Sequence, residues 1–319
     1  MPLLVPGILV FRRDFVIVNV FFGQRNRHGI PQKNLGDAVN KAVREVLLEI
    51  DLQGTERTEA IGPNIFDDVY RYAAPADLKG DAIIDIKPQA YPTRTTKDRV
   101  KLVSPEEFDR KKGVGNRMVS VLFDDLQKIL LVDWDVEDTK ITISKFDSLT
   151  SDGSNWAAFG DANTIELNQT NKVEGGASIE FDLTGSGGTA GVYNSGRTSL
   201  NVGTDIFNNG YATMWYFVNS VADTTSIFLR LGNDASNYHQ VYVGTDITDG
   251  TFVVGWNQVL WRWGGRTTVG TVNPAAIDYV AVYMNKVSTK EDDGYRFDDL
   301  ICHSGEIFEC HFFGERLWQ

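Results

Sequence analysis

Short alternating runs of β-branched and aromatic residues fill the second half of this 319-residue chain and constrain its fold more than any other feature. Seven of them are GASIEFDL, YATMWYFV, SIFLRLG, YHQVYVG, WNQVLWRW, DYVAVYM and YRFDDLIC. Turns rich in Asn, Asp, Gly and Thr separate these runs at near-regular spacing. This pattern is typical of antiparallel sandwiches and jelly rolls, so we expect an all-β domain from Lys145 onward. Both faces of YATMWYFV are apolar, which predicts a central strand covered on each side.

The composition of the chain changes where these runs begin. Up to Ser144 there are 21 Lys and Arg against 22 Asp and Glu, whereas from Lys145 onward 10 basic residues face 21 acidic ones. Glycine rises from 9 to 21 residues across the same point, and six of the seven tryptophans follow it. We therefore predict domains at residues 1–144 and 145–303, with 304–319 as a C-terminal strand or packing tail.

The first part of the chain mixes helical and strand patterns. Apolar residues recur at helical spacing over residues 34–54 and predict an amphipathic helix. The run AIIDI predicts a strand, and Ser104 is placed to cap a short helix in SPEEFDR. The segment VSVLFDDLQKILLVDW predicts two strands joined at Asp124–Asp125. Together these patterns indicate an α+β domain.

Several classes of function are disfavoured by the sequence. The acidic second half argues against direct binding of nucleic acid, which needs clustered Lys and Arg. The apolar N-terminal stretch is interrupted by Arg12 before it is long enough to span a bilayer, so no membrane association is expected. Cys302 and Cys310 lack the spacing of a metal or redox motif and are interpreted as reduced, partly buried thiols.

No motif of a known catalytic centre is found in the sequence. GxSxG, Walker A, GxGxxG and HExxH are missing, and the four histidines lack metal-ligand spacing. The paired acids Asp298–Asp299 are adjacent on an expected strand and therefore point to opposite faces, so they do not flank one glycosidic bond. We expect a protein that is not an enzyme.

One stretch of the first part resembles a known group of proteins. In YRYAAPADLKGDAIIDIKPQ a tyrosine-rich strand enters a Pro-Ala-Asp-Leu turn after a long helix. Over residues 34–135 this order resembles structural proteins of tailed-phage virions, in particular neck and head-to-tail connector components. The resemblance implies a virion protein assembled in the host cytoplasm as a cyclic homo-oligomer, in contact with portal, neck or tail proteins. An unrelated α+β domain with the same proline turn is the alternative.

The second part resembles the jelly rolls of carbohydrate-binding modules. The segments KFDSLTSDGSNW, VEGGASIEFDL, YATMWYFV, GWNQVLW and YRFDDLIC follow the order of that family's strands over residues 145–303. The resemblance implies an outward jelly roll on the virion, where it covers its neighbours or binds glycans. It also implies an alternative function, a carbohydrate-binding adhesion protein of a host-recognition or tail-associated kind.

The same resemblance implies a structural calcium ion between the first and last strands of the jelly roll. Carried over, the ligands would be Asp147 of KFDSL and Asp298 of RFDDL, whose carboxylates suit a hard cation. Two solvated aspartates that protect an edge strand are the alternative.

Glycan binding would use exposed aromatic rings that stack on sugars. By residue type the candidates are Trp215, Trp256, Trp261, Trp263, Tyr238 and Tyr242, and the last four are the predicted glycan-contacting residues. Alternation places Trp261 and Trp263 on one face of their strand, and packing between two sheets is the competing interpretation, because a jelly roll must bury large aromatics. The C-terminal residues Phe312, Phe313, Leu317 and Trp318 are expected to pack on a neighbouring copy or on further chain.

Overall fold

The computed structural model describes residues 56–61, 64–88, 101–113, 117–124, 127–134, 136, 138–151, 153–185, 188–287 and 294–314. The chain divides into two units, Met1–Gln53 and Gly54–Gln319, and every described residue belongs to the second. The helix expected over residues 34–54 lies outside the described residues. No helix among the described residues has the length and apolarity needed to cross a membrane.

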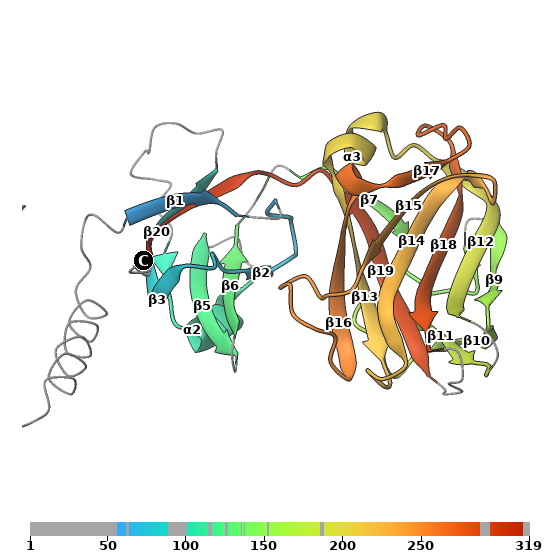
Figure 1. Ribbon diagram of the computed structural model, residues 1–319, viewed down its shortest axis with the longest axis horizontal. Helices are drawn as coiled ribbons and strands as arrows, with labels where there is room; N and C mark the ends of the chain where they lie inside the picture. Colours follow the sequence, from blue (N-terminus) through green and yellow to red (C-terminus); the bar gives the residue numbers. More distant parts are fainter. Residues whose placement is uncertain are drawn as a thin grey trace, which may run out of the picture. The chain divides into compact units, whose positions relative to one another are not determined.

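A two-sheet β-sandwich contains most of the described residues (Figure 1). One sheet has six strands: β7 (Lys140–Ser144), β10 (Ala162–Asn168), β11 (Ser178–Leu183), β13 (Tyr211–Val218), β16 (Gly255–Arg262) and β19 (Tyr295–His303). The other sheet has seven: β8 (Thr150–Ser151), β9 (Ser154–Gly160), β12 (Thr189–Leu200), β14 (Thr224–Asp234), β15 (Asn237–Val243), β17 (Thr267–Val269) and β18 (Ile277–Lys286). The predicted all-β sandwich is confirmed.

Strands distant in sequence are neighbours in both sheets. The six-stranded sheet has the order β10-β11-β19-β13-β16, with β7 also paired to β19, and the seven-stranded sheet has the order β17-β15-β14-β18-β12-β9-β8. The strand pairs in both sheets are antiparallel. As predicted, β13 lies inside its sheet, with β19 on one side and β16 on the other. Helix α3 (Thr204–Asn209) and the 3-10 helix η2 (Trp263–Gly265) follow β12 and β16.

The core of the sandwich lies between its two sheets, and strand alternation determines which side chains enter it. In β18, Val280, Val282 and Met284 belong to this core. Tyr279, Ala281 and Tyr283 alternate with them and form a second apolar cluster on the opposite surface of the same sheet. β18 therefore has apolar side chains on both faces.

Two smaller sheets are formed by the residues outside the sandwich. The first has the order β1 (Glu56–Ala60), β20 (Phe308–Gly314) and β3 (Leu78–Pro88). The second has the order β2 (Arg71–Ala73), β6 (Gln127–Asp133), β5 (Met118–Asp124) and β4 (Lys101–Leu102), in which β4 and β5 are parallel. The predicted pair of strands around Asp124–Asp125 is confirmed as β5 and β6.

Helix α2 (Pro105–Lys111) confirms the short helix predicted in SPEEFDR. The hydroxyl of Ser104 accepts a hydrogen bond from the backbone N–H of Glu107 at 3.3 Å. Phe108 packs on Met118 and other apolar residues of β5 and β6. The α+β domain as a whole stays a prediction, because its long helix lies outside the described residues.

The C-terminal strand corrects one expectation about the apolar end of the chain. β20 pairs with both β1 and β3, and Phe312 is fully buried in an apolar cluster that also contains Ile86 and Val121. Phe312 therefore needs no neighbouring copy to cover it, since the sheet formed by its own chain does so. Leu317 and Trp318 lie outside the described residues.

Candidate functional site

Two of the four predicted glycan-contacting residues are core residues. Trp261 is 1% exposed and Trp263 is 0% exposed. The indole N–H of Trp261 donates to the carbonyl of Ile227 at 3.1 Å, and Trp263 packs edge-on against Phe207 with 4.9 Å between ring centroids. Neither ring has a face that a ligand could reach, so burial supports the packing interpretation for both tryptophans.

The other two predicted residues, Tyr238 and Tyr242, lie on the outer surface of the seven-stranded sheet. Strand register aligns three rows of side chains across this surface. The first row contains Phe159, Gly191, Tyr283, Phe228 and Tyr242. The second contains Ala157, Tyr193, Ala281, Arg230 and Gln240. The third contains Ser195, Tyr279, Gly232, Tyr238 and Val269. We call these three rows the aromatic face.

The rings of the first row stack in sequence across the sheet. Phe159 and Tyr283 are stacked with centroids 4.3 Å apart and an interplanar angle of 17°. Tyr283 continues to Phe228 at 5.0 Å and 3°, and Phe228 to Tyr242 at 5.3 Å and 28°. The aromatic face therefore carries a continuous line of rings that ends at Tyr242, which is 70% exposed.

Gly191 explains how Phe159 and Tyr283 meet although β12 separates their strands. A Cβ at position 191 would lie 2.2 Å from the carbonyl oxygen of Val282 and 2.5 Å from Cα of Tyr283. Because glycine has no Cβ, the rings of Phe159 and Tyr283 pack against each other over its backbone. Aromatic rings on neighbouring strands often cover a strand glycine in this way.

Arg230 lies among the rings of the aromatic face. Its guanidinium carbon is 4.5 Å from the centroid of Tyr238, 4.9 Å from that of Tyr283 and 5.4 Å from that of Phe159. Its Nε donates to Oε1 of Gln240 at 2.7 Å, and the hydroxyl of Tyr283 donates to the same oxygen at 2.8 Å. Burial raises the pKa of Tyr283 above its ordinary value of 10, although Arg230 opposes this effect, so the hydroxyl stays protonated at neutral pH.

Asp147 and Asp298, the two calcium ligands that the family resemblance implied, both accept hydrogen bonds from one loop between β10 and β11. The backbone N–H of Ala177 donates to Oδ1 of Asp147 at 2.8 Å, and Gly176 donates to the same oxygen. The N–H groups of Val173 and Glu174 donate to Oδ2 of Asp298 at 2.7 and 3.0 Å.

The environment of Asp298 tests whether this loop fits a cation. Asp298 is fully buried, and its Oδ1 has no hydrogen-bond partner among the described residues. Burial, together with the charges of Asp299 and Asp147, raises the pKa of Asp298 to about 6. An orphaned carboxylate oxygen beside a second carboxylate fits a hard cation. No group of three or more His, Cys, Asp or Glu side chains occurs in the described part, so any further ligands would be carbonyls or water.

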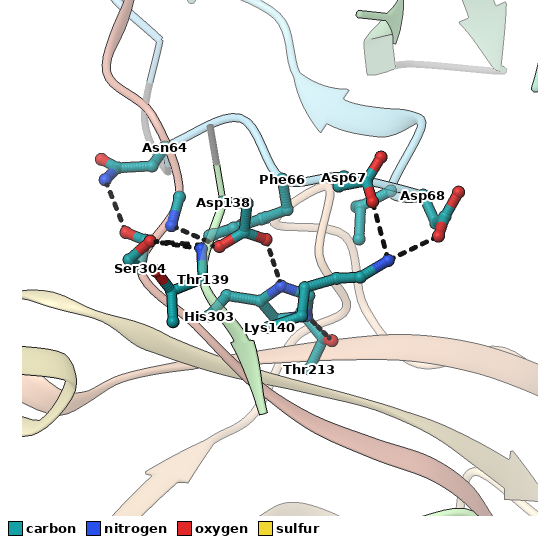
Figure 2. Close-up of polar contacts among 12 residues, drawn as sticks. Asn64, Phe66, Asp67, Asp68, Asp138, Thr139, Lys140, Thr213, His303 and Ser304 are labelled. Atoms are coloured by element: carbon teal, nitrogen blue, oxygen red, sulfur yellow. Dashed lines mark hydrogen bonds and ion pairs between the residues drawn. The ribbon is translucent and has the colours of Figure 1, made fainter. Parts of the chain in front are cut away.

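A buried hydrogen-bonded cluster joins the end of β19 to the segment before β7 (Figure 2). Nδ1 of His303 lies 2.5 Å from Oδ2 of Asp138, and Nε2 of His303 lies 2.9 Å from the hydroxyl of Thr213. Oδ1 of Asp138 also accepts from the N–H of Gly305 at 2.8 Å and from the hydroxyl of Ser304 at 3.3 Å.

Hydrolases use the same order of carboxylate, imidazole and hydroxyl, but this cluster is inaccessible. The side chains of His303 and Asp138 are 1% and 0% exposed, and Thr213 is buried. Because no substrate can reach the hydroxyl, we assign the cluster a structural role. The two cysteines are also buried, and burial raises the pKa of each thiol to about 12.

The sequence matches no protein-family model and no curated protein. The solved structures that it resembles include β-sandwich carbohydrate-binding modules and an exo-β-agarase. A family 30 module of a cellulosomal cellulase from Clostridium thermocellum is 10% identical, with a TM-score of 0.35, and the match covers 53% of this chain and 96% of that one. A module of the β-sandwich superfamily is 10% identical, with a TM-score of 0.34 and coverage of 81% and 99%. A family 29 module is 13% identical, with a TM-score of 0.31 and coverage of 53% and 88%. Because these TM-scores are low, we base the functional proposal on the side chains of this chain.

Most of the aromatic face was not predicted from the sequence. The signal that could have revealed it is in DYVAVYM, where Tyr279 and Tyr283 alternate with the valines that fill the core. Alternation alone does not say which of two apolar faces is covered. The positions of Arg230 and Gln240 in the row between those of the tyrosines follow only from strand register.

Proposed function

We propose that the sandwich is a non-catalytic glycan-binding module and that the aromatic face is its binding surface. The observation that carries this proposal is the line of stacked rings from Phe159 to Tyr242, which borders a half-buried arginine and a glutamine on the outside of the sheet.

The chemistry of this face matches the two needs of a sugar ligand. Pyranose rings present apolar C–H surfaces that pack on aromatic rings, and hydroxyl groups that need hydrogen-bond partners. The ring of Tyr242 is exposed, and the guanidinium of Arg230 and the amide of Gln240 offer donors beside the rings. Tyr242 also lines a groove of about 250 Å³ whose other lining residues include Ile247, Leu260, Asp246 and Asp249.

Calorimetric titration of oligosaccharides, both neutral and acidic, tests this proposal. Tyr242→Ala should weaken binding at least about tenfold while leaving the melting temperature unchanged, because its ring is mostly in solvent. Phe217→Ala is the matched control, since Phe217 is a half-buried aromatic residue on the outer surface of the other sheet. Equal losses in both variants, or none in Tyr242→Ala, would contradict the assignment of the face.

We also propose that Asp147 and Asp298 hold a structural calcium ion. The support is the orphaned Oδ1 of Asp298 and the shared loop of residues 173–177. A bound cation would neutralise two neighbouring carboxylates and fix this loop against β19. The residues themselves contribute charge and position, and no chemical step is assigned to the ion.

A third proposal concerns where such a module is used. We propose that the chain is a structural component of a tailed-phage virion, at the neck or head-to-tail connector, assembled in the host cytoplasm as a cyclic homo-oligomer. Its first support is the order of sequence patterns over residues 34–135, which resembles that of phage neck and connector proteins. Its second support is that β20, after the sandwich, pairs with β1 and β3, before it. The sandwich would then be an outward domain inserted between strands of one sheet. Light scattering with electron micrographs of the purified chain tests this. A closed ring would support it, and a monomer would shift weight to a glycan-binding adhesion protein.

A further inference from the structure

We propose that the glycan bound by the aromatic face is acidic, with a carboxylate or sulfate group seated on Arg230. This inference rests on the proposed glycan-binding function and adds the chemical class of the ligand. Three features support it: the missing counter-charge of Arg230, the excess of hydrogen-bond donors around it, and a contrasting arginine on the other sheet.

The first feature is that the three rows of the aromatic face have a cation and no anion, whereas the aspartates Asp246 and Asp249 lie in the groove beside Tyr242. The rows contain no Asp or Glu, although the chain from Lys145 onward has 21 acidic residues. Among the described residues, no carboxylate forms an ion pair with Arg230, whose guanidinium contacts three aromatic rings. Because the rings exclude water from the guanidinium, its positive charge has an unfavourable free energy when no anion is paired with it. An anionic ligand should therefore bind more strongly here than at an arginine on an open surface.

The second feature is the surplus of donors. Oε1 of Gln240 already accepts from Nε of Arg230 and from the hydroxyl of Tyr283. These two bonds fix the amide orientation, so that its NH₂ group must find acceptors elsewhere. Arginine has five N–H groups and no acceptor, so Arg230 adds further donors even though the hydroxyls of Tyr279 and Tyr283 also accept from its guanidinium. A ligand that supplies only acceptors, such as a carboxylate or sulfate oxygen, matches this surface.

The third feature is the contrast with Arg296 on the outer surface of the six-stranded sheet. Arg296 also stacks on an aromatic ring, with its guanidinium carbon 4.5 Å from the centroid of Phe217. However, its Nε lies 2.5 Å from Oε2 of Glu180, so its charge is neutralised within the chain. The same residue type in the same stacked setting thus has an internal partner on one sheet and none among the described residues on the other. We infer that the partner of Arg230 comes from the ligand.

Calorimetry with three probes tests the inference: an oligogalacturonate, a sulfated galactan oligosaccharide and a neutral cello-oligosaccharide. We expect an acidic probe to bind at least about tenfold more tightly than the neutral one, and its affinity to fall as salt rises from 50 to 500 mM. Comparison of the two acidic probes identifies carboxylate or sulfate as the preferred group. Arg230→Gln should remove this preference, and Arg296→Gln should keep it.

Arg230→Lys is a control for a folding defect in Arg230→Gln. It keeps the positive charge at this position but loses the planar group that stacks on the rings. Melting temperatures of the three variants identify any loss of fold, and the salt dependence of the wild-type protein needs no variant. Preferential binding of the neutral probe, or a preference for acidic probes that persists in Arg230→Gln, would overturn the inference. Either result would leave the proposal of a glycan-binding module standing. Failure of all three probes to bind a folded wild-type protein would instead overturn the proposed function.

Discussion

Replacement of Trp261 by alanine distinguishes a core residue from a ligand-contacting residue, because the two roles predict opposite results. A binding residue can be removed while the fold remains, whereas a core residue cannot. Trp261 is 1% exposed and donates a hydrogen bond of 3.1 Å to the carbonyl of Ile227, so both its packing and its polar group are used inside the sandwich.

The expected cost follows from these two contacts. Removal of a fully buried tryptophan side chain costs about 3–5 kcal/mol, and the carbonyl of Ile227 loses its partner for about 1 kcal/mol more. A domain is stable by about 5–15 kcal/mol, so Trp261→Ala should lose a large fraction of the free energy of unfolding. Trp261→Phe keeps a ring but not the donor, and we expect it to cost about 2 kcal/mol.

Urea denaturation followed by circular dichroism measures this loss, and calorimetry on the same samples measures glycan binding. Tyr242→Ala is the control, with a cost below about 0.5 kcal/mol because its ring is 70% exposed. We expect Trp261→Ala to unfold at much lower urea, and Tyr242→Ala to unfold like the wild type but bind glycans weakly. A Trp261→Ala protein with wild-type stability and no glycan binding would refute the core assignment.

Three further predictions follow from the same contacts. Gly191→Ala should lower stability by more than about 1 kcal/mol in urea melts, because its methyl group would lie 2.2 Å from a carbonyl oxygen of β18; an unchanged melt would show that the strands separate easily. Although burial raises the pKa of Asp138, the hydrogen bond and charge of His303 lower it below its ordinary 3.8. The stability that Asp138 contributes is therefore present above about pH 4 and is lost as the pH falls through the lower pKa of the folded state. Asp138→Asn should be less stable than the wild type at pH 7 and should lose less stability on acidification. Parallel plots of stability against pH for the two proteins would argue against this. Calcium should raise the melting temperature of the wild type after chelation, and Asp298→Asn should not respond; an equal response in both would place the ion elsewhere.

The sequence predicts the sandwich well because its strands alternate strongly and its turns are polar. Such features depend on local pattern and element order, both of which a single sequence contains. The resemblance to a known jelly roll named Asp147 and Asp298 as ligands of one calcium ion, but the sequence does not say whether the two residues approach each other; the structure shows that both accept hydrogen bonds from the loop of residues 173–177.

The sequence does not determine which of the two apolar faces of a strand is buried in the core. WNQVLWRW and DYVAVYM both place aromatic residues at alternate positions, yet Trp261 enters the core while Tyr283 faces outward. The difference depends on which face meets the opposite sheet, and hence on register and on partners far along the chain. Two of the four predicted residues were tryptophans chosen by residue type, whereas the rings of the aromatic face are tyrosines and phenylalanines.

The position of β20 has the same physical origin and changes how the domain order should be understood. β7 and β19 are antiparallel neighbours, with Lys140 opposite His303, so the chain enters and leaves the sandwich side by side. β20 then pairs with β1 and β3, more than 200 residues earlier in the chain, and isolated patterns do not specify pairing at such separations. The predicted order of a first domain, a jelly roll and a tail treats residues 304–319 as an appendage, but β20 lies between β1 and β3 and completes their sheet. The His303–Asp138 hydrogen bond lies where β19 leads to β20. A substitution at Asp138 should therefore weaken the connection between the sandwich and the sheet that contains β20. The aromatic face lies on the other sheet of the sandwich and should keep its ability to bind.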